Sequence, residues 1–195
     1  MLKKLALVIV MATLLSGCIP LVLGGAATVV MAAVYIHDKR TAPEINSDQQ
    51  IQQSIRKKLS TPIFSNECNI QVTVFNGYVL LTGQAPTKEL KIQAQRIALT
   101  THGIMKLYNE IIIASPSSEL TRAKDYWITT RIKVDIMKNK SLQTAQLTII
   151  TQQGTVYLMG SVTNEQANKI VTLASQISGV TQVIKIFPNE QAATW

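Results

Sequence analysis

Hydrophobic and polar positions alternate most regularly in two short segments that carry nearly the same pattern. The first segment is Gly77–Gly83 (GYVLLTG) and the second is Gly154–Gly160 (GTVYLMG). Alternation with a period of two, bounded by glycines, predicts a strand that begins at a turn. The segments are offset by 77 residues (Gly77 to Gly154), so we read the chain as an internal repeat and compare its copies at this offset.

The residues around the first segment predict a helix, a hairpin, a second helix and a last strand. Apolar residues recur at helical spacing in the first helix: Ile51, Ile55 and Leu59. Asp48 is its expected N-cap, and Asn76-Gly77 predicts a tight hairpin turn. Thr87 is the expected N-cap of the second helix, which Gly103 ends before a strand over residues 104–111. The incoming hairpin strand presents one apolar face: Cys68, Ile70, Val72 and Val74.

The same order of elements returns in the second copy. Its first helix repeats the apolar spacing: Ile128, Ile132 and Ile136. Asp125 is the expected N-cap, Gly154 occupies the turn, and Thr163 with Gln166 predicts a capping box before the second helix. The pattern predicts an α+β fold in which each copy has the order α-β-β-α-β. Two helices would cover one face of a three-stranded mixed sheet. We place the copies at residues 47–115 (first repeat) and 123–190 (second repeat), with a linker at 116–122 and a tail at 191–195.

The first residues have the features of a lipoprotein signal. Lys3 and Lys4 precede an apolar run over residues 5–15, which is too short to span a bilayer. The sequence that ends this run, Leu15-Ser16-Gly17-Cys18, resembles the bacterial lipobox. That resemblance implies cleavage after a signal peptide at residues 1–17, and acyl chains, such as palmitate, on Cys18. Ile19 after the cysteine favours the outer membrane by the same resemblance. An uncleaved anchor with a chance cysteine is the alternative.

Residues 18–46 are expected to tether the repeats to the membrane. The run from Ile19 to Ile36 carries no charge and approaches the length of a bilayer span. Pro20, Gly24 and Gly25 interrupt it, so we favour an apolar tether on the membrane surface over a true span.

Candidate catalytic groups are sparse in this sequence. His37 and His102 have no acid or metal ligand at a useful spacing, and no phosphate-binding glycine motif occurs. Cys68 shares its strand face with apolar residues, so we expect a buried side chain rather than a reactive thiol. We therefore expect that the protein is not an enzyme, and that it binds no metal, no small-molecule substrate and no cofactor other than acyl chains on Cys18.

The balance of charge is basic, and it is concentrated in one segment. The formal charge is +8, or +6 without Lys3 and Lys4. Residues 122–140 hold six cations: Arg122, Lys124, Arg131, Lys133, Lys138 and Lys140. Basicity alone is weak evidence for nucleic-acid binding, and the leader directs the chain to a compartment with little nucleic acid.

Within that segment, four residues lie one step around the helix from the buried isoleucines: Trp127, Arg131, Val134 and Lys138. An indole between cations is typical of a membrane interface. Two other interpretations stay open. Trp127 could fill the seam between the repeats, and the cations could form an ordinary solvated face.

The repeated pattern resembles the BON domain, a bacterial module of envelope proteins. The resemblance is closest at residues 79–84 (VLLTGQ), 107–111 (LYNEI) and 127–130 (WITT). Two BON domains behind a lipobox imply an outer-membrane lipoprotein with periplasmic domains. The resemblance also implies binding of anionic phospholipid through the first helix of the second domain, and a role in envelope integrity, including at the cell division site. The residues assigned to that site are Trp127, Arg131, Val134, Lys138, Lys124 and Arg122. The alternative function is a scaffold that contacts outer-membrane assembly or division proteins.

Overall fold

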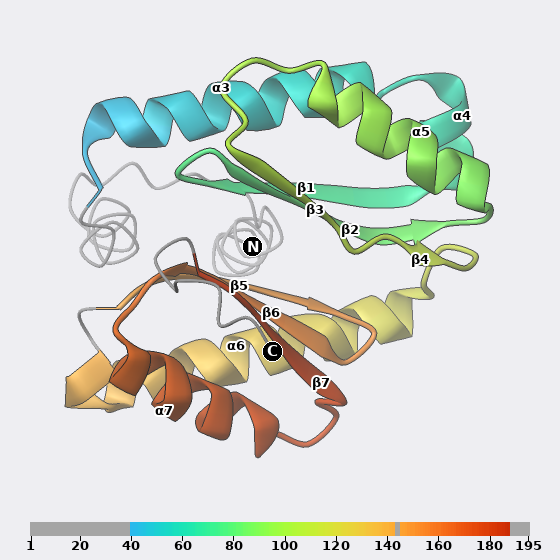
Figure 1. Cartoon of the computed structure of the whole chain (residues 1–195). Coiled ribbons are helices and arrows are strands. Elements are labelled where there is room, and N and C mark those ends of the chain that lie inside the picture. The colour runs from blue at the N-terminus through green and yellow to red at the C-terminus, as the bar shows by residue number, and fades with distance from the viewer. Residues whose placement is uncertain (1–39, 143–144, 188–195) are drawn as a thin grey trace, which may run out of the picture. The chain divides into compact units, whose positions relative to one another are not determined.

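The computed structural model describes residues 40–142 and 145–187, which belong to one compact unit of the chain (Figure 1). The predicted signal peptide, Cys18, His37 and the tail at 191–195 lie outside the described residues. So does most of the predicted tether, up to residue 39.

The first repeat forms one sheet with helices on one of its faces (Figure 1). Its elements are α3 (Ala42–Lys58), α4 (Pro62–Glu67), β1 (Asn69–Phe75), β2 (Tyr78–Ala85), α5 (Lys88–Leu99), β3 (Lys106–Asn109) and β4 (Ile112–Ile113). Strand β2 is central: it pairs antiparallel with β1, and parallel with β3 and then β4.

The second repeat has the same plan with fewer additions. Its elements are α6 (Glu119–Lys138), the 3-10 turn η1 (Lys140–Leu142), β5 (Gln146–Gln152), β6 (Thr155–Ser161), α7 (Asn164–Ser175) and β7 (Gln182–Ile186). Strand β6 pairs antiparallel with β5 and parallel with β7. The predicted α+β class with a mixed sheet is therefore confirmed. The short elements α4 and β4 of the first repeat were not predicted.

Each repeat buries its own apolar core between the helices and the inner face of its sheet. The first core includes Ile55, Val79 and Ala94, all of which are fully buried. The second core includes the corresponding Ile132 and Val156, together with Ile170. These are the positions that the periodicity assigned to buried faces.

The predicted N-caps of the two first helices are wrong. Helix α3 begins six residues before Asp48, after its N-cap Thr41, and α6 begins six residues before Asp125, after its N-cap Ser118. The side chain of Ser118 accepts from the Thr121 amide, as an N-cap does. Helix α3 therefore starts inside the predicted tether, and α6 starts inside the predicted linker. The predicted caps of the later helices, Thr87 and Thr163, are confirmed.

Asp48 and Asp125 instead tie their helices to the hairpin turns. The Asp48 carboxylate accepts from the amides of Asn76 (2.7 Å) and Gly77 (2.9 Å). Asp125, at the same place in the second repeat, accepts from Gln153 (2.8 Å) and Gly154 (2.9 Å). Both aspartates are buried. A buried turn amide needs such an acceptor, so one carboxylate fixes the angle between helix and hairpin.

A third apolar cluster joins the outer faces of the two sheets. It is made of Phe75, Leu80, Ile150, Tyr157, Met159 and Ile186. Buried Gln84 of β2 accepts from the Ser117 amide and donates to Gln152, which ties the linker to both repeats. Burial, with the nearby charge of Glu110, raises the pKa of Tyr157 to about 12.

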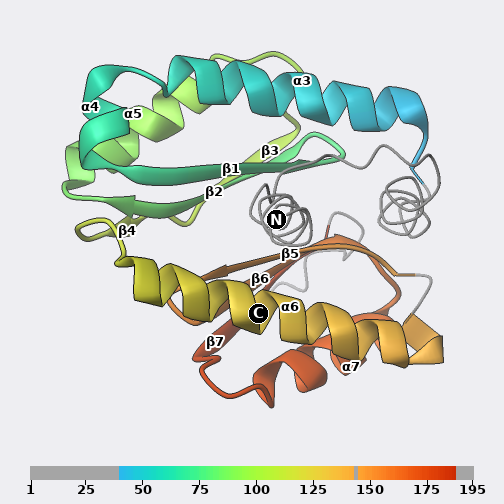
Figure 2. The ribbon, with the colours of Figure 1, turned by 180° about the vertical axis from the view of Figure 1, so that it is seen from behind.

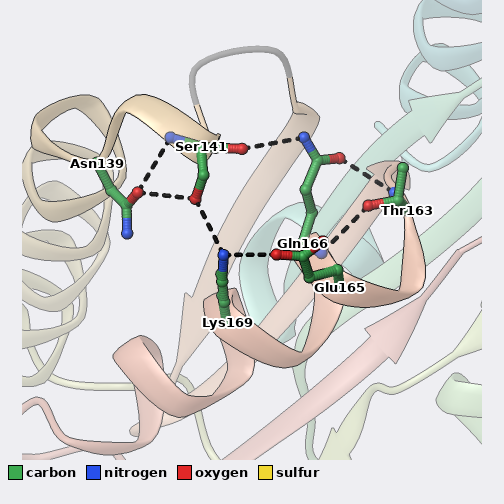
Figure 3. A network of polar contacts seen from close by, with 6 residues as sticks. All are labelled: Asn139, Ser141, Thr163, Glu165, Gln166 and Lys169. Carbon is green, nitrogen blue, oxygen red and sulfur yellow. Dashed lines mark hydrogen bonds and ion pairs between the residues drawn. The ribbon is translucent and has the colours of Figure 1, made fainter.

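The end of α6 is joined to the start of α7 by polar contacts (Figure 3). Asn139 accepts from the hydroxyl of Ser141, which in turn accepts from Lys169. Gln166, part of the predicted capping box, donates to the Ser141 carbonyl. These contacts hold the C-terminal end of α6 and the turn η1 against the start of α7.

We expect Asp125→Ala to lower the free energy of unfolding by about 2–4 kcal/mol, because two turn amides lose a charged acceptor. Asp125→Asn keeps one oxygen acceptor, so its loss should be about half as large. Urea unfolding followed by circular dichroism measures both. Equal stability of Asp125→Ala and the parent protein would contradict this role.

Stability should also fall at alkaline pH through Tyr157. Its folded-state pKa lies above the ordinary value, so folding disfavours the phenolate, and stability decreases from about pH 10 to about pH 12. We expect Tyr157→Phe to flatten the stability profile over this range. An unchanged alkaline slope in Tyr157→Phe would assign the loss to other groups.

Candidate membrane-contact site

Helix α6 has two apolar faces. Its inner face packs on the second core through Ile128 and Ile132, which are buried, and through the partly buried Ile136. The remaining large apolar side chains of the helix point away from this core, because each residue advances about 100° around the axis. They gather on the opposite, solvent-exposed side of the helix.

We call that opposite side the outer face of α6 and define it by its large apolar side chains. These are Leu120, Tyr126, Trp127, Val134 and Met137, with exposed fractions of 67%, 75%, 54%, 37% and 60%. A surface of this kind on one helix marks an interaction site.

Cations line both edges of the outer face. Lys124, Arg131 and Lys138 are spaced by seven residues, about two helical turns, and follow one edge. Arg122 and Lys133 are spaced by eleven, about three turns, and follow the other. An apolar strip between two rows of cations is the arrangement of a helix that lies in a membrane interface.

Two of these five cations have partners within α6 or the linker. Arg131 forms an ion pair with Asp135 at 3.1 Å, and Arg122 donates to the Ser117 carbonyl at 2.6 Å. Within residues 40–142 and 145–187, Lys124, Lys133 and Lys138 form no ion pair or hydrogen bond. Their charges are thus available to an external anion.

The structure brings together five of the six residues predicted for this site. Trp127, Val134, Lys124, Arg131 and Lys138 share the outer face or its near edge. Arg122 lies on the far edge and holds the linker. Trp127 belongs to none of the three apolar clusters, so it does not fill the seam between the repeats.

Sequence reasoning missed several members of the outer face: Leu120, Tyr126, Lys133 and Met137. It followed one row of the helix from Trp127 and took Ser118–Thr121 as linker. A full helical projection of α6 from its true N-cap would have found them.

The corresponding face of α3 has no large apolar side chain. At the offset of 77, the outer positions of α6 match Pro43, Gln49, Gln50 and Lys57 of α3, and Ser60 just after it. The two repeats share their cores and their aspartate contacts, so this face is the main chemical difference between their first helices.

Two other kinds of site are not found within residues 40–142 and 145–187. No helix there is long and apolar enough to cross a bilayer, and no cluster of acidic, histidine or cysteine side chains is placed to hold a metal. Cys68 packs against the first core. Burial and then the charge of Glu67 raise the pKa of its thiol.

Comparison with known proteins identifies the family. The family model described as "BON domain" matches residues 47–115 and 124–186. The chain therefore belongs to the BON-domain family, with two copies of the domain.

One similar curated protein is "Outer membrane lipoprotein DolP" of Haemophilus influenzae (strain ATCC 51907 / DSM 11121 / KW20 / Rd). It is 33% identical over 187 residues, covering 95% of either chain. The "21 kDa hemolysin" of Actinobacillus pleuropneumoniae is 32% identical, covering 76% of this chain and 77% of its own. This chain is thus a DolP-like BON-domain protein, and the similarity supports outer-membrane localisation.

A solved structure, the C-terminal domain of CdsD of the Chlamydia trachomatis type III secretion system, covers 72% of this chain and 96% of its own. Its identity is 12% and its TM-score 0.27, values too low to support an argument.

Proposed function

We propose that this protein is a lipid-anchored outer-membrane protein whose second BON domain binds anionic phospholipid through the outer face of α6. The observation that carries the proposal is the apolar strip from Leu120 to Met137 between two rows of cations. A helix that only faces water does not need an apolar strip between cations. A bilayer interface matches both features, because its acyl layer accommodates the apolar strip and its anionic headgroups attract the cations.

The physical contributions are individually small. Trp127 and Tyr126 place amphipathic rings at headgroup depth, and Val134 adds apolar burial. Each unpartnered lysine near an anionic surface adds about 1 kcal/mol. Such a helix binds weakly and reversibly when it acts alone.

Anchoring converts this weak contact into a persistent one. Acyl chains on Cys18 would hold the domains near the bilayer at an effective concentration in about the millimolar range. The acyl chains then select the membrane, and α6 selects regions of that membrane that are rich in anionic lipid. We extend the proposal to support of outer-membrane integrity from the periplasmic side, including at the division site.

Trp127→Glu should abolish binding of the protein to phosphatidylglycerol vesicles, because a carboxylate replaces the indole within the apolar strip. Vesicle co-sedimentation at low salt measures this, and binding of the parent protein should weaken as salt rises.

The matched control is Gln50→Glu on α3, at the position that corresponds to Trp127, which lowers the net charge by the same one unit. This variant should retain most of the binding. Binding that survives Trp127→Glu, or that is lost equally in both variants, would remove α6 from the site.

Cys18→Ala should release the protein from the membrane fraction and abolish labelling by radioactive palmitate, since its thiol would carry an acyl chain. Trp127→Glu should leave both properties intact. Palmitate labelling of Cys18→Ala at the parental level would contradict the lipidation proposal.

A further inference from the structure

Strand β1 of the first repeat is an edge strand whose outward backbone is covered. The Val72 carbonyl accepts from the side chain of Gln52 at 2.5 Å and from Arg56 at 3.5 Å, both from α3. Helix α4 packs beside the same strand. Proteins commonly cover an edge in this way, because exposed backbone groups can pair with another chain.

Strand β5 of the second repeat is the corresponding edge strand, and the described residues provide no such cover for it. The pairing Val72↔Leu81 of the first sheet corresponds to Ile149↔Leu158 of the second, so the Ile149 carbonyl points outward as that of Val72 does. Thr129 and Lys133 of α6 stand where α3 has Gln52 and Arg56.

Neither replacement covers the strand. The Thr129 hydroxyl is too short to reach the carbonyl and shares a hydrogen bond with the Thr151 hydroxyl at 2.8 Å. Lys133 contacts no partner within the described residues. In those same residues, no hydrogen bond reaches the Ile149 backbone from outside the sheet. Only the short turn η1 stands at the chain position of α4.

A groove of about 300 Å³ runs along this strand beside α6. Its lining includes Ile149, Thr129, Tyr126 and Arg122, and Gln71 from the first repeat. Asp125 also lines it, but both oxygens of its carboxylate accept from turn amides. Lys133 lies one helical turn beyond Thr129. The groove therefore offers the outward backbone side of β5, an exposed aromatic ring and the cation Arg122, with a second cation, Lys133, close by. Figure 2 shows how α6 runs alongside β5.

We propose that the β5 edge binds an extended, acidic peptide segment of a partner protein, which adds a fourth strand to the second sheet. Backbone hydrogen bonds to the outward groups of Leu147 and Ile149 supply the pairing. Arg122 and Lys133 select acidic over basic side chains. The occupant is a peptide rather than a lipid, because lipid has no alternating donors and acceptors to match a strand edge.

The test uses the full chain in detergent micelles and three synthetic peptides. The first alternates valine and threonine between terminal glutamates. The second has lysines in place of the glutamates, and the third is the first with N-methyl groups on alternate amides. Amide hydrogen exchange by NMR reports on Leu147 and Ile149, whose N–H groups point outward.

We expect the acidic peptide to slow exchange of these two amides at least tenfold. The basic and N-methylated peptides should have little effect. Equal effects of acidic and N-methylated peptides would overturn strand addition. Protection of the two amides before any peptide is added would show that the chain covers its own edge, and would overturn the proposal as well.

A pair of exchanged variants provides the matched control. Thr129→Gln with Lys133→Arg transfers the cover of β1 onto β5 and should abolish peptide protection at Ile149. Gln52→Thr with Arg56→Lys removes the cover of β1 and should create new protection at Val72. Unchanged exchange of core amides in β6 for the first pair, and in β2 for the second, verifies the fold of both. Peptide protection of Ile149 that persists in the first pair would contradict the proposal.

Discussion

The contact on which both repeats depend is a buried carboxylate that accepts two amides of a hairpin turn. Asp48 and Asp125 each join the first helix of a repeat to the turn between its first two strands. Without this contact, isoleucines on one helix face could pack on the sheet at several angles. With it, rotation of α6 about its axis is fixed. The inner face then meets the core, and the outer face, which includes Trp127, must be exposed.

The two repeats share this contact between helix and turn, and they differ in the surfaces that they expose. The first repeat places polar residues on the outer side of α3 and covers β1 with Gln52 and Arg56. The second repeat places an apolar strip between cations on α6, and within residues 40–142 and 145–187 its Thr129 and Lys133 do not cover β5. We infer that the first repeat stabilises the second through the apolar cluster around Leu80 and Tyr157. The second repeat would then carry the proposed contacts with lipid and with a partner peptide.

The periodicity of the sequence was sufficient for the order of elements, the core residues and the hairpin turns, because these depend on local spacing and on glycine conformations. It failed at the N-caps, since an aspartate before an apolar helix matches a cap as well as it matches a long-range acceptor. The contact between Asp125 and Gly154 joins distant residues and leaves no local pattern. Three of the five apolar residues of the outer face were missed: Leu120 because it seemed to precede the helix, and Tyr126 and Met137 because they lie off the row that runs from Trp127. The cover of the β1 edge by Gln52 and Arg56 could not be predicted from the sequence, because it depends on the register in which β1 pairs with β2.

Fluorescence quenching tests most directly whether the outer face of α6 enters the bilayer interface. In a Trp195→Phe background, Trp127 is the only tryptophan of the chain. Phosphatidylglycerol vesicles with bromine at different acyl depths would report its position. We expect strong quenching by bromine near the headgroup and weaker quenching deeper in the bilayer. Fluorescence of Trp127 that no brominated lipid quenches, with the protein bound to the vesicles, would contradict it.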